Sequence, residues 1–271
     1  NASFTVIEFF GGYWTDSTAI MADAVHDLGD SFVIGFAWLL SYLAQKNADS
    51  AYTYGYRRFS LLGAVVSGLV LSVGSMLIMA EAVPRLLDPV MPQAAGMLGL
   101  AIAGIVVNGI AAMTLRQGKT MNEQMLNWHL LEDVLGWVAV LIVATVMQII
   151  DWPILDPLLS IGFTLFILIN VLRNLWVTGR LFFQAVLDPD LLTCVRESLM
   201  SLKEIDDVHH LHLWSLDGEH HVLTAHVRVE PLKDITEYSR LKATINSALA
   251  SQDLAHTTIE IELNEEPCRD E

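Results

Sequence analysis

Hydrophobic residues form long runs through the first two thirds of the chain and short alternating runs through the last third. A transmembrane helix needs about 20 predominantly apolar residues. The long runs extend over residues 4–14, 32–43, 59–83, 97–115, 130–150 and 154–177, and the second continues back through more polar residues to His26. This pattern predicts a bundle of six membrane-spanning helices, the first of which is truncated.

The segments between these runs carry charges that predict an orientation. Basic residues gather in alternate connections and at the end of the last run, namely Lys46, Arg57, Arg58, Arg116, Lys119, Arg173 and Arg180. The other connections contain only Arg85. Because Lys and Arg are enriched in cytosolic loops, we expect both ends of the chain to face the cytosol.

The pattern changes near Asp188, after which the chain is polar and acidic. Its periodicity predicts, in order, a helix (190–202), two strands (208–215 and 221–230), a helix (236–250) and a strand (257–263). The Asp217-Gly218 pair between two alternating runs is typical of a hairpin turn. We therefore expect a transmembrane domain (1–180), a linker (181–189) and a small two-layer α+β domain (190–271).

The composition supports a membrane protein and argues against a nucleic-acid-binding protein. The chain is 53% hydrophobic, whereas about 45–50% is usual for soluble domains. A net charge of −16 argues against nucleic-acid binding, which requires a basic face. Cys194 and Cys268 are too far apart for a CxxC metal site. The chain begins at Asn1 without a recognisable signal peptide, so we expect further residues before it.

The membrane half contains two histidines, and each is followed four residues later by an aspartate: His26 with Asp30, and His129 with Asp133. Residues four apart lie on one face of a helix. Two such helices facing each other would supply two nitrogen and two oxygen ligands, the number that tetrahedral zinc takes. The alternative is that each histidine is a single polar residue satisfied by backbone or interfacial water.

Energetics favour the metal site. An ionisable group at membrane depth costs a few kcal/mol unless it meets a partner or an ion, and a divalent cation offsets two carboxylates at once. Asp23 shares roughly the ligand face, where it lines an entry path or acts as an acid favoured near a helix N-terminus. Asp27 and Glu132 adjoin ligand positions and should point elsewhere.

Several motifs resemble the cation diffusion facilitator family, in order and over essentially the whole chain. They are Glu8-Phe-Phe-Gly-Gly12, Met21-Ala-Asp-Ala-Val-His26-Asp-Leu-Gly-Asp30-Ser31, Tyr54-Gly55-Tyr56-Arg57-Arg58, Asn127-Trp-His129-Leu-Leu-Glu-Asp133, Val208-His-His-Leu-His-Leu-Trp214 and Thr258-Ile-Glu-Ile-Glu262. The resemblance implies a homodimer with six helices per subunit and a ferredoxin-like cytosolic domain. It implies no enzymatic activity, but export of a divalent metal in exchange for protons.

The resemblance also assigns residues. The transport ligands map onto His26, Asp30, His129 and Asp133. Members with this set are typically zinc transporters, and imidazole independently suits zinc better than manganese or magnesium. Some bacterial relatives have histidines in the loop before the third helix, whereas this chain has Tyr52 and Tyr56 there, so we expect no metal site in that loop.

The other seven histidines lie in the C-terminal domain. Alternation along the strand predicts His210 and His212 on one face and His209 on the other. The resemblance implies a regulatory zinc site at comparable places, for which the candidates are His209, His212, His226, Glu260 and Glu262. The alternative for this acidic domain is that its histidines are solvated and its charge merely concentrates zinc.

We expect an integral membrane protein of the bacterial inner membrane that exports Zn2+ by alternating access. Its partners would be zinc ions, protons, lipid and a second copy of the chain. Two alternatives remain: an exporter of Cd2+, Co2+, Mn2+ or Fe2+, and a zinc sensor that transports nothing. An intramembrane metallohydrolase is disfavoured because no HExxH motif occurs.

Overall fold

The computed structural model describes residues 2–44, 46–115, 121–186, 188–264 and 266–268. Side chains at 33, 34, 37, 38, 41, 44, 115 and 121–129 also lie outside the description, as do Arg116 and Lys119, on which part of the predicted orientation rests. Contacts divide the chain into two compact units, which are described separately: Asn1–Leu39 with Gly63–Leu175, and Leu40–Leu62 with Trp176–Glu271.

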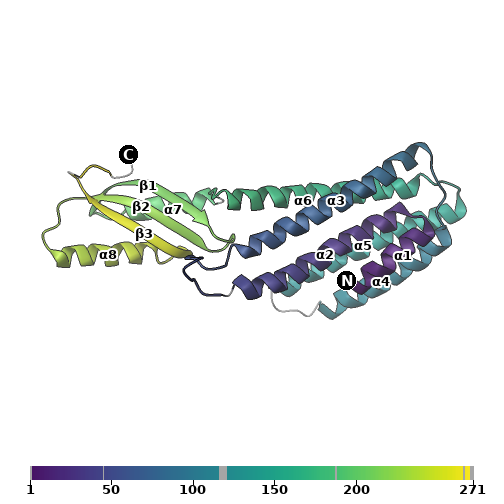
Figure 1. Cartoon of the computed structure of the whole chain (residues 1–271), viewed down its shortest axis with the longest axis horizontal. Helices are drawn as coiled ribbons and strands as arrows, with labels where there is room; N and C mark the ends of the chain where they lie inside the picture. Colours follow the sequence, from purple (N-terminus) through teal and green to yellow (C-terminus); the bar gives the residue numbers. More distant parts are fainter. Residues whose placement is uncertain (1, 45, 116–120, 187, 265, 269–271) are drawn as a thin grey trace. The chain divides into compact units, whose positions relative to one another are not determined.

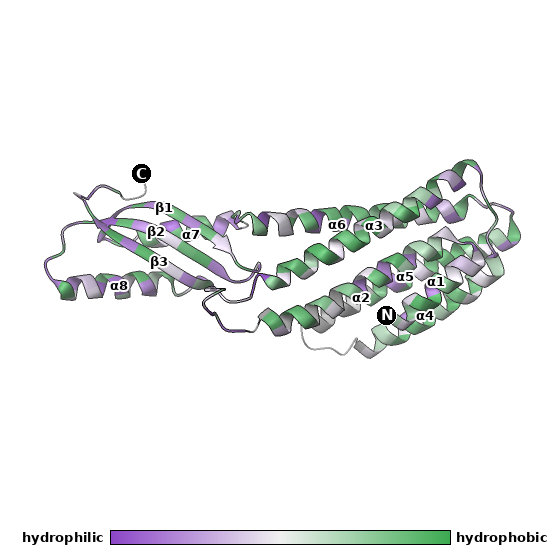
Figure 2. Cartoon of the chain, viewed as in Figure 1, coloured by the Kyte–Doolittle hydropathy of each residue, from purple (hydrophilic) through white to green (hydrophobic). Residues whose placement is uncertain are grey.

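Within the described residues, six helices precede the C-terminal domain, as predicted (Figure 1). They are α1 (Ala2–Thr15), α2 (Thr18–Ala44), α3 (Phe59–Leu87), α4 (Ala94–Leu115), α5 (Met121–Ile149) and α6 (Leu155–Phe182). Four contain apolar spans long enough to cross a membrane: Phe59–Leu87, Ala94–Thr114, Leu130–Ile149 and Leu155–Phe182. These helices are mostly hydrophobic along their length (Figure 2), and many of their large apolar side chains are exposed, as lipid-facing residues would be.

The helical unit is held together by close packing around Trp137 of α5, which is 1% exposed. Its neighbours in the core include Ile20 of α2 and Met97 of α4, and the Phe4 ring meets it edge-on at 5.8 Å. Gly104 of α4 permits this approach, because a Cβ there would lie 2.3 Å from the indole ring. Small residues allow helices in membranes to pack at short range.

The start of α2 is capped by a residue that is distant in sequence. The first N–H groups of a helix have no intrahelical acceptor. Buried Asp156, in the first turn of α6, accepts hydrogen bonds from the Thr18 amide at 2.7 Å and the Ser17 hydroxyl at 2.5 Å. Ser160, one turn further along α6, donates to the Thr18 carbonyl at 3.0 Å. These bonds fix the beginning of α2 to the beginning of α6.

The C-terminal domain has the predicted αββαβ order: α7 (Pro189–Met200), β1 (Ile205–Ser215), β2 (His221–Val229), α8 (Ile235–Leu249) and β3 (Leu254–Leu263). The sheet order is β1-β2-β3, with β1 and β2 antiparallel and β2 and β3 parallel. Asp188 caps α7 and Asp234 caps α8 through their side-chain oxygens. The strand directions are those of a ferredoxin-like domain that lacks its first strand.

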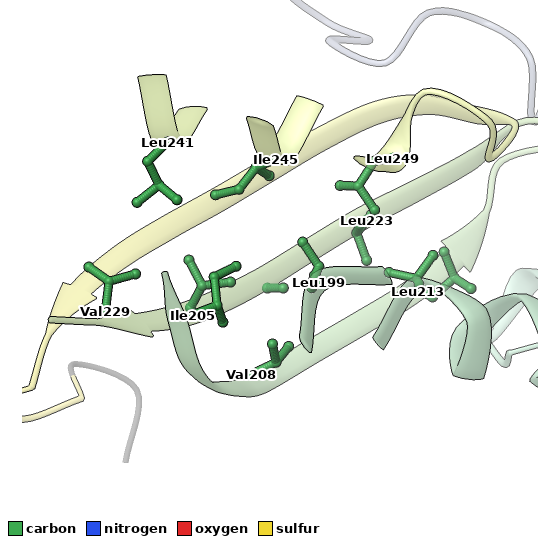
Figure 3. Close-up of a cluster of buried hydrophobic side chains, with 12 residues drawn as sticks. Leu199, Ile205, Val208, Leu213, Leu223, Val229, Leu241, Ile245 and Leu249 are labelled. Atoms are coloured by element: carbon green, nitrogen blue, oxygen red, sulfur yellow. The ribbon is translucent and has the colours of Figure 1, made fainter. Parts of the chain in front are cut away.

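The core of this domain lies between the sheet and its two helices. Leu199 of α7 and Ile245 of α8 face Leu213 and Leu223 of the strands (Figure 3). On β2 the core residues are at odd positions, so His226 belongs to the opposite face of the sheet. That face is therefore the one on which β2 presents its polar side chains.

The predicted alternation of histidines on β1 is wrong. Val208 and Leu213, five residues apart, both belong to the core, which a regular strand does not allow. The register shifts between His209 and His212, and His210 has a positive φ of 44°. This irregularity adds a residue to β1, so the rings of both His209 and His210 lie beside His226, at centroid distances of 5.6 and 5.3 Å.

The hairpin turn is organised by Asp217. Its Oδ1 accepts hydrogen bonds from the amides of Glu219 and His220 at 3.0 and 2.8 Å, and Gly218 takes a φ of 106°, which favours glycine. Burial acts to raise the pKa of Asp217, but these hydrogen bonds and the His220 ring outweigh it, so the pKa lies below its ordinary value.

We predict that Asp156→Ala destabilises the helical unit by on the order of 2 kcal/mol, because a cap is lost and buried donors are left unsatisfied. Thermal unfolding in detergent should show a lower midpoint. Asp151→Ala, at an exposed position in the connection just before α6, is the matched control and should change little. Equal midpoints for the two variants would show that the cap contributes nothing.

We predict that Asp217→Asn loosens the hairpin at neutral pH and that the difference from the parent chain shrinks in acid. A lowered folded-state pKa contributes stability above the unfolded pKa of about 3.9, and this stability is lost as the pH falls through the folded value. Hydrogen exchange of a peptide covering residues 213–223, compared between the two chains at each pH, measures this. A difference that is independent of pH would contradict the role of the charge.

Candidate metal centres

The first candidate centre joins α2 and α5. His26 Nε2 lies 3.6 Å from Asp30 Oδ2, one turn further along α2. The same nitrogen lies 3.9 Å from Asp133 Oδ1 on α5. These separations are longer than a hydrogen bond and close to the distance of about 3.3–3.5 Å between nitrogen and oxygen ligands in a zinc tetrahedron. Thus the structure brings together three of the four residues predicted for the membrane site.

The fourth residue, His129, lies on α5 one turn before Asp133, but its side chain is outside the described part. Helical spacing alone places it on the face of Asp133. We call His26, Asp30, His129 and Asp133 the predicted transport site. Asp133 is 6% exposed, so its charge is largely withdrawn from solvent.

Further carboxylates surround this site. Glu8 of α1 is fully buried, and Asp27 and Asp23 of α2 are 4% and 9% exposed. Glu8 forms a hydrogen bond with Asp27 and lies within electrostatic reach of Asp23 and Asp133. Glu132 is exposed, as expected, whereas Asp27 is buried beside Glu8. The sequence interpretation gave Glu8 no role, although it is the only charged residue in the first apolar run.

The second candidate centre lies on the sheet of the C-terminal domain. Ligand atoms of His209, His226, Glu262 and Cys268 all lie within 4.8 Å of one another, and we call these residues the sheet-face group. His226 Nδ1 is 2.7 Å from Glu262 Oε1, and His209 Nε2 is 2.9 Å from Glu262 Oε2. Within the described residues this is the one such group of three or more potential ligands.

The remaining predicted candidates in this domain take other positions. Glu260 Oε2 lies 3.8 Å from His226 Nε2, the nitrogen that faces away from Glu262. His212 is exposed and lies outside the sheet-face group. Cys268 was not among the candidates, because the sequence contains no second cysteine near it to form a metal-binding motif.

The environment of Glu262 favours its ionised form, which is the form that binds a cation. Burial acts to raise the pKa of Glu262, but hydrogen bonds with His226 and Cys268 and attraction to the two imidazoles lower it below its ordinary value. Two imidazoles, a carboxylate and a thiol are ligand types that zinc accepts in fours. The donor set therefore fits a zinc ion.

The loop before α3 contains a different arrangement. The Tyr56 hydroxyl donates to Asp49 Oδ2 at 2.6 Å, and the Tyr52 and Tyr56 rings lie 4.6 Å apart. Asp49 Oδ1 accepts from the amides of Ala51 and Tyr52. The carboxylate in this loop is thus used to hold the turn, and the tyrosines pack on each other.

A bundle of apolar helices that carries a His–Asp cluster around buried Asp133, followed by a small α+β domain with its own potential ligands, defines a membrane protein that handles metal cations. Comparison with known families identifies which one. The model of the cation efflux transmembrane domain matches residues 1–182, and that of the cation efflux protein cytoplasmic domain matches residues 187–264. The chain belongs to the cation efflux family, also called cation diffusion facilitators.

The individual relatives of the chain are also named as cation transporters. The chain is 31% identical to the "Zinc transporter ZitB" of Escherichia coli (strain K12), over 98% of this chain and 85% of the relative. It is 29% identical to the "Cadmium, cobalt and zinc/H(+)-K(+) antiporter" of Bacillus subtilis (strain 168), over 96% and 85%. It is 28% identical to the "Metal cation efflux system protein CzcD" of Cupriavidus metallidurans, over 98% and 84%.

We predict that Asp133→Asn weakens zinc binding by the membrane domain about tenfold or more, because the amide lacks the charge of a buried ligand. Titration of the purified protein with zinc in detergent, by calorimetry or a competing chelator, measures this. Glu132→Gln removes an exposed carboxylate from the adjacent position and should leave the affinity unchanged. Equal losses in the two variants would point to a general effect of charge.

Proposed function

We propose that this chain exports zinc(II) across the membrane in exchange for protons, by alternating access to the predicted transport site. The observation that carries the proposal is the approach of His26 to Asp133, two residues on different helices of an apolar bundle. Membership of the cation efflux family supports export. Relatives whose printed names include zinc and an antiporter support the substrate and the coupling.

The ligands favour zinc over several other divalent metals. Two imidazoles and two carboxylates suit a tetrahedral ion of intermediate softness, whereas oxygen-only sites suit manganese or magnesium. The antiporter from Bacillus subtilis is also named for cadmium and cobalt, so export of these ions is the alternative that a relative favours. A sensor that binds zinc without moving it is the second alternative.

Proton exchange follows from the chemistry of the ligands. Zinc requires neutral imidazole and ionised carboxylate, so protons compete for the same atoms. Histidine has an ordinary pKa near 6.5, about the pH of many compartments, and a modest pH difference across a membrane can therefore favour release. In this proposal the helices rearrange so that the site opens to one side at a time.

The C-terminal domain would act as a regulatory zinc-binding domain and as part of a homodimer. The proposal is supported by the potential ligands His209, His226 and Glu262 on one face of its sheet, and the family model that it matches describes a cytoplasmic domain. The basic residues Lys46, Arg57 and Arg58 lie in the connection before α3, and Arg180 lies in the last turn of α6. The positive-inside rule assigns both places to the cytosol. We accordingly propose an inner-membrane location with this domain in the cytosol.

We predict that proteoliposomes containing this protein take up zinc when a pH gradient is imposed and that His129→Ala lowers the flux about tenfold or more, because one of four ligands is lost. A metal-sensitive dye inside the vesicles reports the flux. His256→Ala, which removes an exposed imidazole from β3, is the control and should transport normally.

Each other outcome points to one alternative. Zinc binding without flux in the parent protein would favour the sensor. Flux that ignores the pH gradient would contradict proton exchange but not export. Flux that survives His129→Ala would contradict the predicted transport site, and faster flux of cadmium or cobalt than of zinc would favour the broader exporter.

A further inference from the structure

The chain turns back after β3 and returns to the sheet. The Glu266 amide donates to the Leu263 carbonyl at 2.9 Å, and the Leu263 amide donates to the Glu266 carboxylate at 2.9 Å. Asn264 donates to Asp206 at the start of β1 at 2.8 Å. These bonds lead the chain to Cys268, which is only 8% exposed although Glu266 and Pro267 before it are exposed.

Cys268 is buried against the potential metal ligands of the sheet. Its Sγ lies 3.5 Å from His226 Nδ1, and it also forms a hydrogen bond with Glu262. Sulfur and nitrogen ligands of one tetrahedral zinc ion are separated by about 3.5 Å, given metal–ligand bonds of about 2.3 and 2.0 Å. The thiol is thus already at ligand spacing from one member of the sheet-face group.

Each histidine of the group has a carboxylate near its other ring nitrogen, and for His209 that carboxylate is within hydrogen-bonding distance. Asp207 Oδ2 lies 3.1 Å from His209 Nδ1, while His209 Nε2 faces Glu262. Glu260 Oε2 lies 3.8 Å from His226 Nε2, while His226 Nδ1 faces Glu262 and Cys268. Metal-binding histidines almost always have such a partner, which fixes the ring and its tautomer.

We propose that Cys268 is the fourth ligand of this centre and that a bound zinc or cadmium ion fastens the C-terminal segment to the sheet. The inference rests on the proposed regulatory site and adds a ligand to it. The family match to the C-terminal domain ends at residue 264, so this ligand comes from beyond the matched region. A metal would thus link three parts of the domain: the β1–β2 pair, the end of β3 and the returning segment.

The thiolate changes which ions the site prefers. Soft sulfur ligands favour zinc and cadmium and disfavour manganese and magnesium. A closed set of four protein ligands is also typical of zinc sites that hold structure. The ion would therefore act by restraining the returning segment, in which Glu266 and Pro267 are exposed.

The test uses the full-length protein in detergent and two cysteine variants, since Cys194 is exposed and lies on α7. Cadmium titration should produce an ultraviolet thiolate-to-cadmium charge-transfer band in the parent protein and in Cys194→Ser, and none in Cys268→Ser. Zinc should protect Cys268 from alkylation, identified by mass spectrometry, while Cys194 reacts equally with and without zinc. Cys268→Ser should weaken zinc binding at this site about tenfold to a hundredfold.

Two results would overturn the proposal. One is a charge-transfer band that persists in Cys268→Ser. The other is Glu262→Gln losing the C-terminal site while Cys268→Ser retains it at full affinity, since Cys268 would then be only a small buried side chain that covers His226. The proposed function is tested independently of Cys268, because the dependence of zinc flux on His129 reports on the predicted transport site alone.

Discussion

The structure depends on the cost of placing carboxylates inside an apolar helical bundle. Glu8, Asp23, Asp27 and Asp133 are all nearly or fully buried, and they interact with one another. Such groups cost several kcal/mol each in an apolar medium unless a cation or proton neutralises them. A bundle stabilised only by packing would not retain them. Their presence around the predicted transport site is explained if a cation binds there, because a bound ion or a proton offsets their mutual repulsion.

The sequence was sufficient to predict the helices, the αββαβ order and the pairing of His26 with Asp30, because each follows from local periodicity. The two helices of the C-terminal domain begin at capping aspartates, Asp188 and Asp234, whose bonds to nearby amides are also local in sequence. The approach of α2 to α5 is different. No spacing along the chain specifies which helices meet, and this expectation came from the family resemblance. The cap on α2 by Asp156 was equally invisible, since its partners are more than a hundred residues away.

The C-terminal site shows where period-based reasoning fails. Alternation would separate His209 from His210, but one extra residue in β1 brings both rings to His226. This irregularity places His210 in a strained backbone conformation with positive φ. The pattern of histidines in the sequence does not predict it. Cys268 was overlooked for another reason. A single cysteine beyond the last strand has no motif, and only the turn at Leu263 and Glu266 brings it back to the sheet.

The two centres differ in a way that matches different roles. The predicted transport site has two nitrogen and two oxygen donors divided between two helices, so movement of one helix against the other changes the ligand set. Its ion must leave, and protons can replace it at every ligand. The sheet-face group instead lies within one small domain, with the His209 ring held by Asp207, and the proposed thiol ligand would complete it. A closed set of four protein ligands is typical of zinc sites that hold structure, whereas the proposed export requires the membrane site to release its ion in every cycle.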